Sequence, residues 1–327
     1  MSRKSITVSK AINEALIEEM RRDKKVFLIG EDIAVWGNAF GVTRGCLEEF
    51  GEKRVLDTPI AEAGYTGLAV GAAMRGARPV AEIMYNDFFT VAADPIINQA
   101  AKARYMSGGQ VKVPIVIRMP MGSGRRNAGQ HSQSFENMFC HVPGLKVVAP
   151  STAEDAKGLM KSAIRNDDPV IYLEHKLLYA KKEDIPEEEY LIPLGEAKVR
   201  REGTDVTVIT WSRQVNFALE AAEKVAAEGI NVEVIDLRTL VPLDWDAIVK
   251  SVSKTHKVVV VSEEVKRGSY AGELSAMIAE ELFDELDAPV ARVCGLNIVS
   301  PFSPVLEDQN FPQVADIVKA IKKTLNV

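Results

Sequence analysis

The sequence has few cysteines, few aromatic residues and no long apolar run. Its three cysteines, Cys46, Cys140 and Cys294, lie far apart, and none belongs to a Cys-x-x-Cys pair. This spacing predicts neither a disulfide framework nor a zinc site, and it is typical of a reducing compartment. The sequence also lacks a signal-peptide core and an apolar stretch of membrane-spanning length. We therefore expect a cytoplasmic protein without membrane association or, in a eukaryote, an organelle protein.

Neither sign of charge dominates the chain. Lysine and arginine number 40 and aspartate and glutamate 46, which gives a net charge of −6. Without a basic stripe interleaved with aromatic residues, this balance argues against a nucleic-acid partner. Phosphate-binding motifs are missing as well, because Gly122-Ser-Gly124 lacks the third glycine of a dinucleotide fingerprint and no P-loop is present. These absences argue against a Rossmann oxidoreductase.

What is present is an alternation of strand-like and helix-like patterns over 327 residues. The apolar runs predict strands at 26–30, 80–84, 113–118, 146–149, 170–174, 206–209, 232–235, 258–261 and 290–293. Such alternation predicts an α/β fold with mostly parallel sheets. A polar, proline-bearing stretch interrupts the pattern, so we predict domains at 1–185 and 204–327 with a linker at 186–203.

Several helix ends can be placed from their capping residues. Ser9 is expected to cap the first helix, and Asp94-Pro95 to begin another that runs to about Met106. The capping box Ser151-Thr-Ala-Glu154 predicts a third helix, and Asp244 a fourth. An amphipathic pattern predicts a last helix near the C-terminus.

The stretch from Val55 to Gly71 joins a short apolar run, a carboxylate at Glu62 and a helical pattern. Gly64, Gly67 and Gly71 recur at spacings of three and four, which places them on one helix face. Each glycine costs a helix roughly 1 kcal/mol relative to alanine, so three on one face indicate a close approach by another group. Glu62 lies at the positive end of this helix. It is either a first-turn cap, with the glycines forming a tight helix contact, or an acid–base group beside a ligand or partner chain.

Asp57-Thr-Pro-Ile-Ala-Glu62 and the glycine run resemble the beta subunit of thiamine-diphosphate-dependent 2-oxo acid dehydrogenases, which include pyruvate, branched-chain and acetoin types. The resemblance covers nearly the whole chain in order, through 78–84, 98–109, 130–133, 143–148, 155–158 and 236–239. It implies a pyrimidine-type thiamine-diphosphate-binding domain followed by a transketolase C-terminal-like domain.

The resemblance also implies a divided active site. The Gly-Asp-Gly motif that holds magnesium and the diphosphate is absent here, which argues against a self-sufficient transketolase-like enzyme. In the family, a separate alpha subunit supplies that half and holds the magnesium, in an α2β2 heterotetramer. The implied reaction is oxidative decarboxylation of a 2-oxo acid such as pyruvate, with acyl transfer to a lipoyl group. Acetoin cleavage, a branched-chain substrate and a non-catalytic scaffold subunit are the alternatives.

Four residues match family positions at the cofactor and substrate. Glu62 matches the glutamate that hydrogen-bonds the aminopyrimidine ring and favours the tautomer that accepts a proton. His131 matches a histidine facing the substrate and the lipoyl group; the alternative is a loop histidine bonded to backbone. Met84 and Phe88 match positions that line the pyrimidine pocket, although on pattern alone both are more often core residues.

Further family features have weaker sequence signals. A structural potassium ion would be held by backbone oxygens of Ile115, Ala163, Ile164, Asn166 and Asp168. The acidic stretch 283–287 is expected to dock the lipoyl acyltransferase core through the C-terminal domain. Arg125 and Arg126 either bind a substrate carboxylate or, as we favour, are solvated. Segment 85–91 differs from the pyruvate and branched-chain patterns, so the substrate stays open.

Overall fold

A computed structural model describes residues 3–327, which divide into two compact units. The first contains the chain as far as Met121 and residues 138–194, and the second contains residues 122–137 and 195–327. Segment 122–137 is thus grouped with a part of the chain that follows it much later in sequence. The predicted domain limits, 1–185 and 204–327, stay a prediction.

The first unit is built on a parallel sheet with strand order β6-β7-β5-β4-β2-β3. The strands are β2 (Val26–Gly30), β3 (Val55–Asp57), β4 (Arg78–Glu82), β5 (Val116–Met121), β6 (Lys146–Val148) and β7 (Val170–His175). A separate antiparallel pair joins β1 (Arg3–Thr7) to β8 (Lys182–Pro186). This arrangement confirms the prediction of a mostly parallel α/β fold. Apolar strands that are buried on both faces of a parallel sheet need helices on each side.

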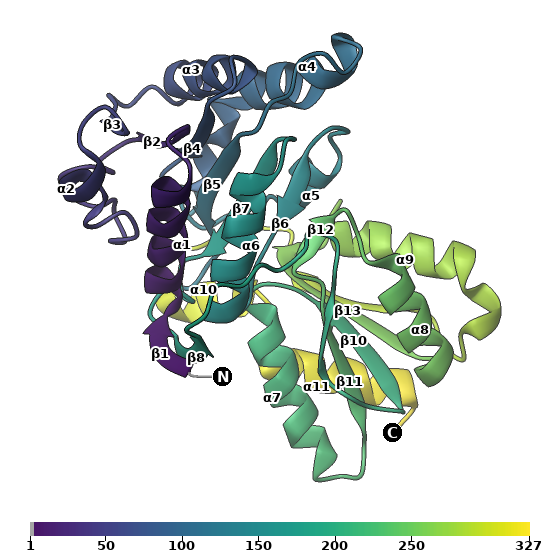
Figure 1. Cartoon of the computed structure of the whole chain (residues 1–327). Coiled ribbons are helices and arrows are strands. Elements are labelled where there is room, and N and C mark those ends of the chain that lie inside the picture. Colours follow the sequence, from purple (N-terminus) through teal and green to yellow (C-terminus); the bar gives the residue numbers. More distant parts are fainter. Residues whose placement is uncertain (1–2) are drawn as a thin grey trace. The chain divides into compact units, whose positions relative to one another are not determined.

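Helices cover both faces of this sheet (Figure 1). One face packs against α1 (Val8–Arg22) and α6 (Ala153–Arg165), and the other against α3 (Glu62–Met74) and a π-helical turn, η2 (Pro95–Ala100), continued by α4 (Ala101–Met106). The shorter elements are α2 (Cys46–Phe50), η1 (Asn86–Thr90) and α5 (Glu136–Cys140).

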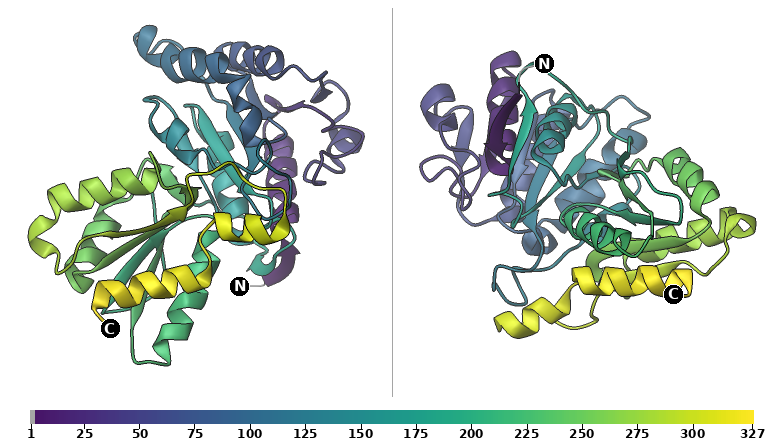
Figure 2. Two further views of the ribbon diagram at one scale, coloured as in Figure 1. Left: turned by 180° about the vertical axis from the view of Figure 1, so that it is seen from behind. Right: turned by 90° about the horizontal axis from the view of Figure 1, so that it is seen from below.

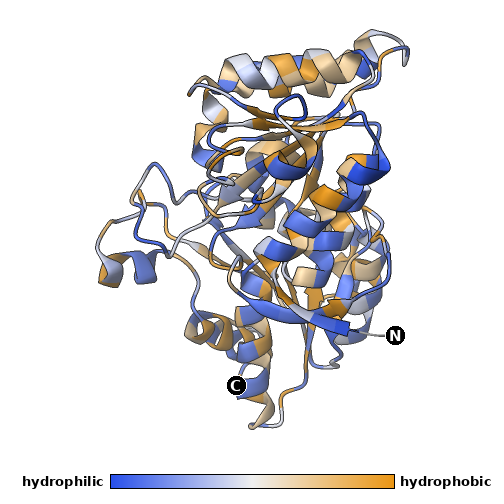
Figure 3. Ribbon diagram, turned by 60° about the vertical axis from the view of Figure 1, so that its left-hand side comes forward, coloured by the Kyte–Doolittle hydropathy of each residue, from blue (hydrophilic) through white to orange (hydrophobic). Residues whose placement is uncertain are grey.

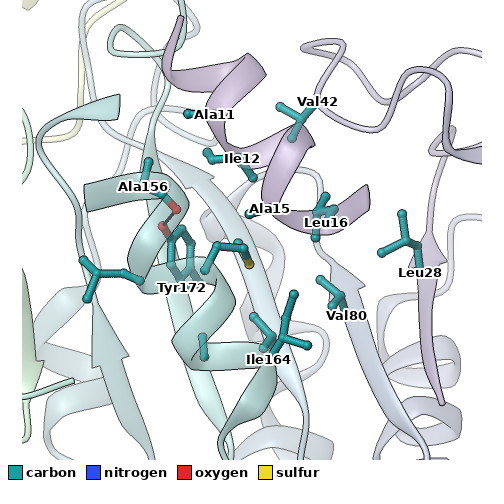
Figure 4. Packing of buried hydrophobic residues seen from close by; sticks show 14 of the residues in the cluster. Ala11, Ile12, Ala15, Leu16, Leu28, Val42, Val80, Ala156, Ile164 and Tyr172 are labelled. Atoms are coloured by element: carbon teal, nitrogen blue, oxygen red, sulfur yellow. Dashed lines mark hydrogen bonds between the residues drawn. The ribbon is translucent and has the colours of Figure 1, made fainter. Parts of the chain in front are cut away.

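The core of the first unit lies between α1, α6 and the sheet (Figure 4). Ile12 and Leu16 of α1 are fully buried among apolar side chains of α6 and the strands. Tyr172 of β7 is also buried, and its hydroxyl donates a hydrogen bond to the Ala156 carbonyl at 2.7 Å. This bond satisfies the one polar atom that the ring carries into the core.

Two predicted caps are wrong by one or two positions. Thr7, not Ser9, accepts the hydrogen bond from Lys10 N at the start of α1, because β1 ends there. Thr152 caps α6 through Asp155 N, one residue after the expected Ser151. Asp94 is the N-cap residue of the helical segment that runs to Met106, as predicted, but its side chain accepts bonds from side-chain amides and not from the backbone.

The second unit has a five-stranded sheet with order β14-β13-β10-β11-β9, parallel except for β9. Its strands are β9 (Lys198–Arg201), β10 (Val206–Thr210), β11 (Val232–Asp236), β13 (Val258–Val265) and β14 (Ala291–Gly295), and a short β12 (Thr239–Val241) lies between β11 and β13 in sequence. The four parallel strands were predicted. Strand β9 was not, because it is half exposed and polar.

Helices α7 (Gln214–Ala226) and α11 (Val314–Leu325) pack together on one face of this sheet (Figure 2). The other elements are α8 (Trp245–Thr255), capped by Asp244 as predicted, α9 (Tyr270–Glu281), η3 (Phe283–Glu285) and α10 (Pro304–Asn310). In both units the apolar residues gather along the strands and the helix faces that cover them (Figure 3). Among residues 3–327, no helix is both long and apolar enough to cross a membrane.

Candidate functional site

Glu62 is the first residue of α3 and follows β3 after a short turn. Ala61 precedes the helix without a side-chain cap, and its carbonyl accepts the first bonds, from Gly64 N and Tyr65 N. Glu62 is only 7% exposed. Its carboxylate accepts no hydrogen bond from any residue of 3–327. It is therefore not a helix cap, and the buried oxygens are available to a donor from outside the chain.

A second carboxylate lies beside Glu62. Glu31 directly follows β2, the neighbour of β3 in the sheet, and is 6% exposed. Burial and the charge of Glu62 raise the pKa of Glu31 to about 7, while the neighbouring Tyr65 opposes the shift. Glu31 is therefore about half protonated at neutral pH, where an ordinary glutamate is ionised. Glu31 was not among the predicted site residues, although a polar residue at the carboxyl end of a parallel strand is a recognised signal of a binding edge.

A buried charge network crosses the same sheet. Arg118 of β5 pairs with Glu82 of β4 and donates to both carboxylate oxygens of Glu174 in β7, at 2.8 and 2.6 Å. Asn38 donates to Glu82 at 2.9 Å, and the Tyr179 hydroxyl to Glu174 at 2.6 Å. All five side chains are buried, and because one guanidinium faces two carboxylates, burial and the charge of Glu174 raise the pKa of Glu82.

Met84 and Phe88 lie just beyond β4 and are half-buried. Phe88 packs edge-to-face with Tyr85, with ring centroids 6.2 Å apart. By contrast, the adjacent Phe89 is buried and packs against Phe139 at 4.7 Å. The core position here belongs to Phe89, which leaves Met84 and Phe88 partly accessible.

His131 lies in segment 122–137 of the second unit, whereas Glu62, Met84 and Phe88 belong to the first. The segment forms a closed loop, because Gly122 N donates to Gln133 O at 3.1 Å and Ser123 Oγ to Ser132 O at 2.9 Å. His131 is half-buried on this loop. His175 and His256 form hydrogen bonds with backbone groups through Nδ1.

The contacts within the units correct one expectation and remove one alternative. Arg126, which we expected to be solvated, donates to Glu307 at 2.8 Å and to Asp308 at 2.7 Å. Gly67 and Gly71 do not form a tight helix contact, because their face of α3 is exposed and Gly71 has open space around its α-carbon. The chain therefore leaves the glycine face of α3 uncovered.

The five carbonyl groups predicted to hold potassium lie around the start of β5 and the end of α6. Ile115 O and Ala163 O accept backbone hydrogen bonds, and Ile164 O and Asn166 O accept bonds from Arg78. A carbonyl oxygen has two lone pairs, and at Ile164 and Asn166 one of them is already used by the guanidinium cation of Arg78. Over the described range 3–327, no cluster of histidine, cysteine and carboxylate side chains is placed to hold a metal ion, and the three cysteines are free thiols.

Comparison with known proteins identifies both units by sequence. A family model described as "Transketolase, pyrimidine binding domain" matches residues 4–182, and "Transketolase, C-terminal domain" matches residues 195–317. Among solved structures, the chain is similar to "Split gene transketolase, inactive beta4 tetramer", with a TM-score of 0.80 over 98% of each chain and 24% identity. At that identity the likeness describes the fold alone.

Curated relatives are much more similar. The chain is 50% identical to "Pyruvate dehydrogenase E1 component subunit beta" of Rickettsia felis, over 97% of this chain and 98% of that one. It is 48% identical to "Acetoin:2,6-dichlorophenolindophenol oxidoreductase subunit beta" of Bacillus subtilis, over 98% and 97%. It is 49% identical to the mitochondrial "Pyruvate dehydrogenase E1 component subunit beta" of Rattus norvegicus, over 98% and 91%.

Proposed function

Because the chain belongs to the family of beta subunits of thiamine-diphosphate-dependent 2-oxo acid dehydrogenases and their acetoin-specific relatives, we propose that it is the beta subunit of a pyruvate dehydrogenase first component. In this role it contributes the pyrimidine half of a cofactor site whose diphosphate half belongs to an alpha subunit. The names of the relatives support pyruvate as the first candidate substrate and acetoin as the second.

The observation that carries this proposal is the buried carboxylate of Glu62, which has no donor within residues 3–327. Such a group is costly unless a ligand or a partner supplies the missing bond. A ring nitrogen that carries a proton fits this acceptor, so the residues present suit an aminopyrimidine. Thiamine diphosphate, when bound, supplies the chemistry that breaks the bond next to a keto group.

Each residue of this chain then has a defined task. Glu62 accepts the hydrogen bond of the ring nitrogen and holds the proton there. Glu31 lies beside it with its pKa raised to about 7, so it can carry a proton and lower the negative charge next to Glu62. Met84 and Phe88 supply the half-buried apolar wall against the ring. His131 exchanges protons with the substrate or the acyl acceptor.

The exposed glycine face of α3 supports association with other subunits. Gly64, Gly67 and Gly71 are exposed, and Leu68 of the same helix is 57% exposed. A surface of this kind lets another backbone approach closely. We assign it to the contacts of an α2β2 heterotetramer in which the alpha subunit holds magnesium.

The acidic stretch 283–287 supports docking of a lipoyl acyltransferase core. Phe283 is 72% exposed and Asp284 has no partner among the described residues, whereas Asp287 pairs with Lys257 at 2.9 Å. Exposed carboxylates around an apolar side chain suit a basic partner. Changing Asp284 and Glu285 to lysine is expected to weaken binding to the core at least tenfold. Unchanged affinity in a pull-down titration would remove the docking proposal.

We also propose a potassium site, a cytoplasmic location and limits for the two domains. Ile115, Ala163, Ile164, Asn166 and Asp168 would hold potassium through backbone oxygens, and added KCl should then raise the melting temperature more than NaCl does. A cytoplasmic location and domain limits at 185 and 204 complete the assignment.

The experiment that tests the function uses this chain assembled with its alpha subunit, magnesium and thiamine diphosphate. Reduction of an artificial electron acceptor is followed with pyruvate, branched 2-oxo acids and acetoin, and each chain alone serves as the control. Turnover of pyruvate only by the assembled pair is expected. Turnover of acetoin alone would assign the second candidate function, and activity of this chain by itself would contradict the divided site.

A further inference from the structure

The loop that carries His131 is held by a single buried carboxylate of the second unit. Glu307 of α10 is 0% exposed. Its Oε1 accepts a hydrogen bond from Gly124 N at 2.9 Å, and its Oε2 accepts bonds from Arg126 N at 3.1 Å and Arg126 Nη1 at 2.8 Å. Three donors, two of them backbone amides, thus converge on one side chain, and bonds to a charged acceptor are the stronger kind.

The two ends of segment 122–137 are tied down by other carboxylates. Ser123 N donates to Glu263 Oε1 at 2.5 Å, and Asn137 N donates to Glu264 Oε1 at 2.8 Å. Gly129 lies so close to a neighbouring side chain that a β-carbon would come within 2.5 Å of Val299 Cγ1. The segment is therefore fixed at its ends and near its middle, and Glu307 holds the part between Ser123 and His131.

The backbone between these anchors is strained. Arg126 and Ala128 have φ values of 62° and 59°, a left-handed conformation that costs a non-glycine residue about 1–2 kcal/mol. Such a conformation persists only where surrounding contacts impose it. The bond of Glu307 to Arg126 N acts directly on one of the strained residues. Without it, the loop is expected to relax toward ordinary backbone angles and to move His131.

We infer that Glu307 is a positioning residue for His131, which it holds in place through the backbone at Gly124 and Arg126. The inference rests on the proposed function, since it concerns the site in which His131 acts. Glu307 acts through the loop and has no step of its own in the chemistry.

The kinetic test is a double-mutant cycle in the assembled enzyme. Glu307→Gln keeps the side-chain volume but turns an amide NH2 toward backbone donors, and it is expected to lower kcat about tenfold with KM for pyruvate changed less than twofold. In a His131→Ala background the same change should add no further loss, because residues that act as a unit are not additive. Equal losses in both backgrounds would overturn the inference.

Asp308→Asn is the matched control, because Asp308 is adjacent and contacts the segment only through the Arg126 side chain. It is expected to keep kcat within twofold. A second readout, limited trypsin digestion of the full-length chain, is independent of activity. Cleavage after Arg125 and Arg126 should accelerate at least fivefold in Glu307→Gln, and an unchanged rate would overturn the inference. Full activity of His131→Ala would instead refute the proposed role of His131, which the digestion rates do not involve.

Discussion

The two units both bury carboxylates beside a candidate site residue, but they use them in opposite ways. In the second unit, the carboxylate of Glu307 accepts hydrogen bonds from three donors of the His131 loop. In the first, Glu62 accepts no hydrogen bond within the described chain, and its neighbour Glu31 retains a proton up to about pH 7. A buried carboxylate whose bonds are complete is an anchor, whereas one left without donors is available to a ligand.

The charge network of the first unit shows a third use of buried carboxylates, in which they pair with a buried cation. Glu82 and Glu174 are also buried, but Arg118 lies between them and forms an ion pair with each. Burial alone therefore does not distinguish a functional carboxylate from a structural one. The identity of the hydrogen-bond donor does, and the following changes test that distinction.

The largest effect on stability is expected from Arg118→Met. This change leaves Glu82 and Glu174 buried without a cation, which should cost about 3–5 kcal/mol of unfolding free energy. Urea denaturation of the purified chain measures it. Arg3→Met removes an ion pair whose side chains are 48% and 42% exposed, and should cost less than about 1 kcal/mol. Equal losses in the two variants would contradict the assignment.

The largest effect on activity is expected from Glu62→Gln. Since the Glu62 side chain makes no hydrogen bond with residues 3–327, the substitution should leave the melting temperature within a few degrees. Activity of the assembled enzyme should fall about 100- to 1000-fold, the range typical of a positioned acid–base group. Glu48→Gln, in the short helix α2, changes an exposed carboxylate and should keep full activity. A fully active Glu62→Gln enzyme would favour a scaffold role.

A smaller, pH-dependent effect is expected from Glu136→Gln in the second unit. Burial and the charge of Glu264 raise the pKa of Glu136 to about 8, although Trp211 donates to it at 3.0 Å. The folded state therefore binds a proton that the unfolded state releases above its ordinary pKa of about 4.5. Between pH 5 and 8 the wild type should lose about 2 kcal/mol more unfolding free energy than the variant. Parallel urea titrations at the two pH values measure this difference, and equal losses would contradict it.

Glu31→Gln should show the same sign with the smallest size. The folded pKa of about 7 means that the stabilising proton is lost between pH 4.5 and 7. Because Glu31 is less enclosed than Glu136, we expect a difference of about 1 kcal/mol between pH 5 and 7. Thermal unfolding at these pH values would detect it as a relative rise of about 2 °C in the melting temperature of the variant at pH 7. A variant with the wild-type pH dependence would place the titrating proton elsewhere.

Much of the fold follows from local pattern. The apolar runs predicted the parallel strands of both sheets except β3, and the glycine pattern after Glu62 predicted a helix that does begin at that residue. The errors were local, as at Thr7 and Thr152, where strand ends and side-chain geometry shift a cap by one or two positions. Strand β9 was not predicted, because an exposed polar edge strand lacks the apolar pattern by which strands are recognised.

The sequence by itself determined the α/β class, the helix that presents Glu62, and the family, because these depend on periodic patterns and on motifs read in order along the chain. Only the tertiary structure decided which carboxylates are anchors. Glu307 follows Gly124 by more than 180 residues, and nothing local to either predicts that they bond. Likewise, Glu62 and Glu31 differ from Glu82 only in the donors that packing brings to them. Hydrogen bonds between distant segments depend on which segments the fold brings together, and the residue pattern along the chain does not show this.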